Sequence, residues 1–85
     1  MDSSINKRDI VKIEDIISTD DKIYGIKDFK SRKYGSVAYI DMSIFIDNNK
    51  TLEEAHNIAD NLENDIISKL SYIKEINIHT EPYKG

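Results

Sequence analysis

The segment that most constrains the fold is SVAYIDMSIFID, residues 36–47. It is rich in β-branched and aromatic residues, which favour strands. Because side chains of a strand alternate between its two faces, the order of these residues predicts one apolar face and one more polar face. The predicted apolar face holds Ile40, Met42, Ile44 and Ile46, and the other face holds Tyr39, Asp41, Ser43, Phe45 and Asp47.

Two further segments have the apolar spacing of helices. Residues 5–18 predict an amphipathic helix whose apolar side holds Ile10, Ile13, Ile16 and Ile17. After a loop at 47–50, Thr51 is followed three residues later by Glu54, which is the pattern of a capping box at the start of a helix. This helix is predicted to extend to about Leu70, with an apolar stripe of Leu52, Ala55, Ile58, Ala59, Leu62, Ile66 and Leu70.

Two more strands are expected, one directly before residues 36–47 and one after the second helix. Residues 22–33 mix the apolar Ile23, Tyr24, Ile26 and Phe29 with charged side chains and predict a first strand. A turn around Gly35 then predicts a β-hairpin with residues 36–47. Near the end of the chain, residues 75–81 read EINIHTE and predict a third strand. Its apolar face would carry Ile76 and Ile78.

The resulting order is helix–strand–strand–helix–strand, which predicts a single domain over residues 1–85. The expected fold is an α+β two-layer sandwich of ferredoxin-like type, with both helices on one face of a three-stranded sheet. The other face is then left open, and aromatic residues on such a face are typical of a partner surface. This open face is expected to carry Tyr39, Asp41, Ser43, Phe45, Asn77, His79 and Glu81.

Composition excludes several kinds of function. The chain has no cysteine, which excludes disulfides, thiolate nucleophiles and Cys-ligated metal centres. Its formal net charge of -4 argues against a nucleic-acid partner, and the basic stretch at 27–33 is more typical of a solvated edge strand. No apolar run approaches the roughly 20 residues that cross a bilayer. No nucleophile–base pair or Gly-rich phosphate loop indicates an enzyme.

The stretch EINIHTEP, residues 75–82, raises the question of a metal site. His79 and Glu81 would project from one face of a strand, where an imidazole and a carboxylate can bind a metal ion. The same pair is equally compatible with the solvated face of a half-buried strand. His56 can be a boundary residue of its helix, and Asp41 can pair with Lys27 or another base across the hairpin.

Several stretches together resemble a known family. They contain Gly25, Asp28, Arg32 and Gly35; Asp41 and Asp47; Leu52, Glu54, Ala55, His56, Ala59, Asp60 and Glu63; and finally His79, Glu81 and Pro82. In order and spacing these residues resemble the cytoplasmic C-terminal domain of cation diffusion facilitator transporters. The resemblance covers residues 8–82.

This resemblance implies a domain without catalytic activity of its own. The transporters export divalent cations such as zinc, manganese, iron or cobalt through a membrane domain, which would lie outside these 85 residues. Their C-terminal domain has a metallochaperone-like fold, lies on the cytoplasmic side of the cell membrane and forms a V-shaped homodimer. The implied partners are a second copy, the membrane domain and a divalent cation that binds at the dimer interface.

The resemblance also implies a set of metal ligands, namely His56, His79, Glu81 and Asp41. Two positions depart from the zinc-binding pattern, because Lys27 and Ser43 stand where such members have histidines. Two imidazoles and two carboxylates suit zinc, manganese or iron(II). The alternative is that the Lys27 ammonium replaces a metal ion by neutralising the same carboxylates.

A second interpretation of the chain is a free-standing, soluble ferredoxin-like binding module without a membrane partner. The coding sequence upstream of Met1 discriminates between the two, because a transporter would have several apolar spans of about 20 residues there.

Overall fold

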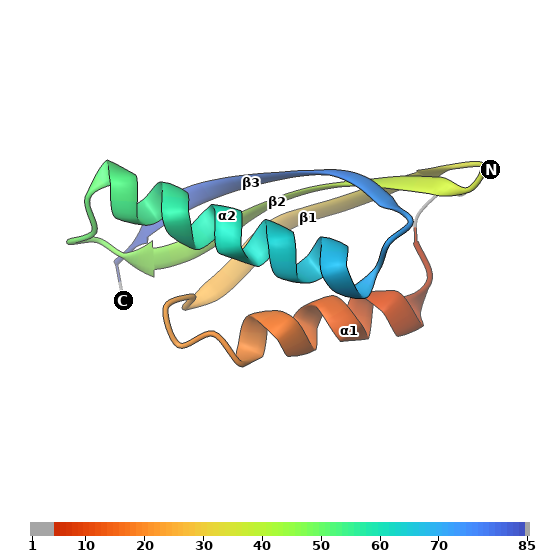
Figure 1. Ribbon diagram of the computed structural model, residues 1–85. Coiled ribbons are helices and arrows are strands. Elements are labelled where there is room, and N and C mark those ends of the chain that lie inside the picture. The colour runs from red at the N-terminus through yellow and green to blue at the C-terminus, as the bar shows by residue number, and fades with distance from the viewer. Residues whose placement is uncertain (1–4, 85) are drawn as a thin grey trace.

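In the computed structural model, which describes residues 5–84, the most strand-like segment becomes the central strand β2, Val37–Asp47. It pairs antiparallel with β1, Gly25–Tyr34, and parallel with β3, Ile73–Tyr83. Helices α1, Lys7–Ser18, and α2, Leu52–Lys69, lie together on one face of this sheet (Figure 1). The predicted α-β-β-α-β order and the two-layer α+β fold are therefore confirmed.

The core lies between the sheet and the two helices. The four predicted inward residues of β2 are all buried, with exposed fractions between 0% and 4%. They pack in one cluster with the buried faces of both helices. The helical members of this cluster are Ile13 and Ile17 of α1, and Ala55, Ile58, Leu62 and Ile66 of α2.

Both helices begin at side-chain caps. The Asn6 Oδ1 atom accepts a hydrogen bond of 3.0 Å from the backbone N–H of Asp9. At α2, the Thr51 hydroxyl accepts from the backbone N–H of Glu54, and the Glu54 carboxylate accepts from the backbone N–H of Thr51. This second bond lowers the pKa of Glu54. The capping box predicted from the sequence is confirmed.

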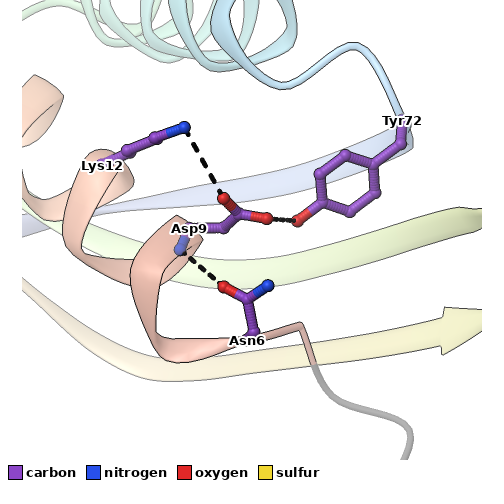
Figure 2. Close-up of polar contacts among 4 residues, drawn as sticks. All are labelled: Asn6, Asp9, Lys12 and Tyr72. Atoms are coloured by element: carbon purple, nitrogen blue, oxygen red, sulfur yellow. Dashed lines mark hydrogen bonds and ion pairs between the residues drawn. The ribbon is translucent and has the colours of Figure 1, made fainter.

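One polar contact joins the start of α1 to the connection between α2 and β3. The Tyr72 hydroxyl donates a hydrogen bond to the Asp9 carboxylate, and Lys12 lies 3.9 Å from the other oxygen of that carboxylate (Figure 2). Burial, followed by this hydrogen bond, raises the pKa of Tyr72 to about 12. Because it joins segments 63 residues apart, this contact fixes α1 against the rest of the domain.

Three details of the sequence prediction are wrong. Leu52 was expected in the buried stripe but is 87% exposed, because it is the first residue of α2 and lies beyond the part of the helix that covers the core. Strand β1 begins at Gly25 rather than 22, since Ile23 is buried in the preceding connection. Strand β3 is longer than 75–81, because it pairs with β2 along its whole length, from Ala38 to Asp47.

A bulge in β1 decides which of its side chains reach the open face. Lys27 is opposite Ser43 and Lys30 is opposite Asp41, so β1 has one residue more than β2 over this interval. Asp28 takes the left-handed conformation that the bulge requires, with φ of 56°. As a result, Phe29 packs against the core while the two lysines on either side of it lie opposite open-face residues of β2.

Candidate functional site

Helices α1 and α2 leave one face of the sheet uncovered (Figure 1). The register of the strands places most of the residues that the sequence singled out on this open face. Residues opposite each other in neighbouring strands point to the same face. One such row runs Lys27, Ser43 and His79 across β1, β2 and β3. The neighbouring rows place Phe45 beside Glu81 and Asp41 beside Asn77.

One ion pair and one histidine–carboxylate contact cross this face on either side of Ser43. The Lys27 Nζ atom lies 2.9 Å from Glu81 Oε1, and the His79 Nε2 atom lies 3.4 Å from Asp41 Oδ1. All four side chains are partly exposed, with exposed fractions between 39% and 65%. Each pair therefore gains little stability from Coulomb attraction, because water screens it. Their main effect is to hold these side chains in position on the open face, and they add little to the stability of the fold.

Ser43 lies on the face that the sequence predicted, but it is buried rather than exposed. Only 7% of its surface is exposed, because its small side chain lies between the longer side chains of Lys27 and His79 in the same row. The buried Ser43 hydroxyl therefore lies at the base of the site, between Lys27 and His79.

Lys27 supplies a fixed positive charge beside Glu81. Its ammonium also lies 5.6 Å from the centre of the Phe45 ring, within the range of a cation–π contact. The hydrogen bond and the charge of Glu81 raise the pKa of Lys27. Of the alternatives for Asp41, the partner is His79 from β3 rather than Lys27, which instead neutralises Glu81.

His56 lies apart from the other proposed ligands. It is on α2, which covers the opposite face of the sheet, and its Nε2 atom is 3.3 Å from Asp60 one helical turn further on. Within residues 5–84, no group of three or more His, Asp or Glu side chains lies close enough together to hold a metal ion. One protomer thus brings together His79 and Asp41, with Glu81 nearby but bound to Lys27.

The donors on the open face fit half of a metal site. His79 and Asp41 offer one nitrogen and one oxygen, and zinc commonly takes four such ligands. A second protomer that presents the same face would supply two more. Lys27 opposes a cation at Glu81, because its three hydrogen-bond donors leave no lone pair for a metal while it is protonated.

An aromatic cluster adjoins this site, and the sequence did not predict it. The Tyr83 ring lies 5.0 Å from the ring of Tyr24 and 6.4 Å from that of Phe45. Tyr24 and Tyr83 remain 50% and 45% exposed. They are far apart in the sequence, and only the pairing of the strands brings them together, so no local pattern could have predicted the cluster. Exposed aromatic groups of this kind are enriched in protein interfaces.

The fold and its uncovered sheet face define a small two-layer α+β domain. Residues 5–83 match the family described as the cytoplasmic domain of cation efflux proteins. The chain belongs to this family, whose members are transporter domains and not enzymes. Membership implies dimerisation and contact with metal ions.

Two relatives illustrate the family. The chain is 26% identical over 83 residues to the manganese efflux system protein MneP of Bacillus subtilis, and 31% identical over 75 residues to the uncharacterized transporter YdbO of the same organism. These matches cover 98% and 88% of the chain but only 28% and 26% of the two relatives. The chain thus spans about a quarter of the length of the curated relatives it matches.

A solved structure has the same fold. The metal-bound C-terminal domain of the CzcD transporter from Thermotoga maritima superposes with a TM-score of 0.85 at 17% identity, over 95% of this chain and 98% of that one. No helix among residues 5–84 has the length and the apolar character to span a membrane.

Proposed function

We propose that residues 1–85 form the cytosolic dimerisation and regulatory domain of a divalent-cation exporter in the cell membrane. The membrane domain would precede it in the full protein, as the C-terminal position of the matching domain in CzcD suggests. The relationship to MneP favours manganese as a transported ion, and zinc and iron(II) suit the same donor types.

The observation that carries this proposal is the pairing of His79 with Asp41 on an open sheet face. Their closest atoms are 3.4 Å apart, and both side chains are more than half exposed. They are therefore accessible to a cation and to a second protomer at once. The exposed aromatic cluster at the same face supplies apolar area for the contact between protomers.

Regulation would follow from differential affinity. A cation that binds a closed dimer more tightly than an open one shifts the population towards the closed form. The size of this shift is limited by the difference between the two affinities. In this scheme His79 and Asp41 of both protomers hold the ion. The closed dimer would then favour the transport-competent state of the membrane domain.

Titration calorimetry with zinc and with manganese tests the metal-binding part of the proposal. We expect binding to the wild-type domain and at least a tenfold weaker affinity for His79→Ala, since loss of even an outer-shell partner has about that effect. His56→Ala is the matched control, because its side chain lies on α2 beside Asp60 and should leave the affinity unchanged. Equal affinities for wild type and His79→Ala would contradict the assignment.

The contact between Lys27 and Glu81 supports a second version of the same function. At 2.9 Å, the ammonium already neutralises a carboxylate beside His79, so the dimer would form without any added metal ion. Titration calorimetry of the wild-type domain with zinc and manganese distinguishes the two versions. The second version predicts no binding heat for the wild-type domain.

A further inference from the structure

The charged residues of the domain are distributed unevenly along its long axis. The strands and helices run along this axis, and the molecule extends 40 Å along it but only 22 and 19 Å across (Figure 1). At one end lie the start of α1, the turn between β1 and β2, the end of α2 and the start of β3. The charged residues of this hairpin end are Lys7, Arg8, Asp9, Arg32, Lys33, Lys69, Lys74 and Glu75.

Direct contacts connect these segments. The backbone N–H of Ala38 in β2 donates to the carbonyl of Tyr72, just before β3. The Tyr72 hydroxyl donates to Asp9 of α1, and the Lys33 ammonium of β1 lies 5.5 Å from the centre of the Tyr72 ring. Tyr72 therefore links β1, β2 and α1 at the hairpin end.

The hairpin end is strongly basic. Six of its eight charged residues are basic, and all six are exposed. One of the two acids, Asp9, already binds Tyr72 and Lys12 (Figure 2). The opposite end, residues 18–25, 45–54 and 80–84, has six acidic residues against three basic ones. A chain with a formal net charge of -4 thus has one positive end.

Helix stability does not explain two of these basic residues. Lys7 and Arg8 occupy the first turn of α1, where the positive end of the helix dipole favours acids and disfavours cations. Glutamates at these two positions would stabilise the helix. Their positive charge is consistent with a role outside the fold.

We propose that the hairpin end binds the anionic surface of a phospholipid bilayer, an inference that rests on the proposed function as the cytosolic domain of a membrane transporter. The backbone N–H of Ile5 donates to the Ser31 hydroxyl in the distal half of β1. A membrane domain that precedes this chain would therefore join it at the basic end. Lysine and arginine clusters near a membrane are attracted to anionic headgroups.

The acidic end does not prevent this contact. Charges are screened over about 8 Å at physiological ionic strength, and the two ends are separated along a 40 Å axis. At the turn between the strands, Tyr34 is 55% exposed. Tyrosine is one of the two residue types that are enriched at membrane–water interfaces.

Co-sedimentation of the 85-residue chain with lipid vesicles tests the inference. The chain should bind phosphatidylcholine vesicles that contain about one third phosphatidylserine, bind them less as salt rises, and leave pure phosphatidylcholine unbound. Lys7→Glu with Arg8→Glu should weaken binding by about tenfold while the melting temperature stays the same or rises. Because this variant is not expected to unfold, its loss of binding would report on charge alone.

A matched control reverses two charges at the other end, with Lys22→Glu and Lys50→Glu. It has the same net charge as the test variant and should bind within about twofold of wild type. Equal loss in both variants would overturn the inference, as would equal binding to the two kinds of vesicle. Displacement by inorganic phosphate at constant ionic strength would indicate a free-phosphate site instead and would also overturn it. Metal binding and dimerisation are measured without vesicles, so failure here leaves the proposed function standing.

Discussion

Tyr72 joins the start of α1 to the connection between α2 and β3. It contacts Asp9 and lies under Lys33, and its pKa is raised to about 12 by burial and by the hydrogen bond to Asp9. The folded domain therefore holds the phenolic proton more tightly than the unfolded chain, whose tyrosine pKa is about 10. The stabilisation is complete below about pH 10 and is lost as the pH rises from about 10 to 12.

Replacement of Tyr72 by phenylalanine should lower the free energy of unfolding by about 1 kcal/mol at neutral pH, since the contact is partly exposed to solvent. It should also flatten the loss of stability between about pH 10 and 12. Urea unfolding across this pH range measures both effects. Tyr24→Phe, at an exposed tyrosine, is the control. A pH dependence unchanged by Tyr72→Phe would show that this hydroxyl does not contribute.

For individual residues, the sequence predicted the face on which a side chain lies better than it predicted how exposed that side chain is. The alternation in β2 placed Ser43 on the open face correctly, yet the serine is buried, because exposure depends on the length of its neighbours in other strands. His56 directly follows the buried Ala55 on α2 and points away from the core. His56 is separated from His79 because His56 lies on α2, whereas His79 lies on the open face of the sheet. Spacing along the chain does not reveal this separation.

Among the elements, β1 departs most from its prediction. The sequence indicated a strand but not the bulge at Asp28, which sets the side chains of Lys27 and Lys30 on the open face. Aspartate is one of the few residues other than glycine that tolerate the left-handed region. The bulge could not be predicted because it becomes visible only in the pairing with β2. The capping box of α2, by contrast, is a local pattern and was predicted correctly.

The φ of 56° at Asp28 makes a direct prediction. Asp28→Gly should leave the free energy of unfolding unchanged or raise it by up to about 1 kcal/mol, whereas Asp28→Val should lower it by about 1–2 kcal/mol, because a β-branched residue is strained there. Chemical denaturation measures both variants. Asn77→Val at an exposed position of β3 is the control and should be close to neutral. A valine tolerated equally at both positions would rule out strain at the bulge.

For the domain as a unit, the order of elements and the single apolar core were predictable, because they depend on periodicity and caps. The aromatic cluster, the contact of His79 with Asp41 and the concentration of basic residues at one end were not, since each joins residues that are distant in sequence. The neutralisation of a carboxylate by Lys27 was one of the alternatives drawn from the sequence, and the structure shows it at Glu81. These are also the features on which the proposed functions depend. The open face would meet a second protomer and a cation, while the hairpin end would face the membrane.

The link between metal and dimerisation is tested most directly by sedimentation velocity of the domain with and without manganese or zinc. We predict that metal lowers the dimer dissociation constant by about tenfold or more, equivalent to at least about 1.4 kcal/mol, and that His79→Ala abolishes this change while His56→Ala preserves it. A dissociation constant that stays the same in chelator and in millimolar metal would contradict metal-linked dimerisation.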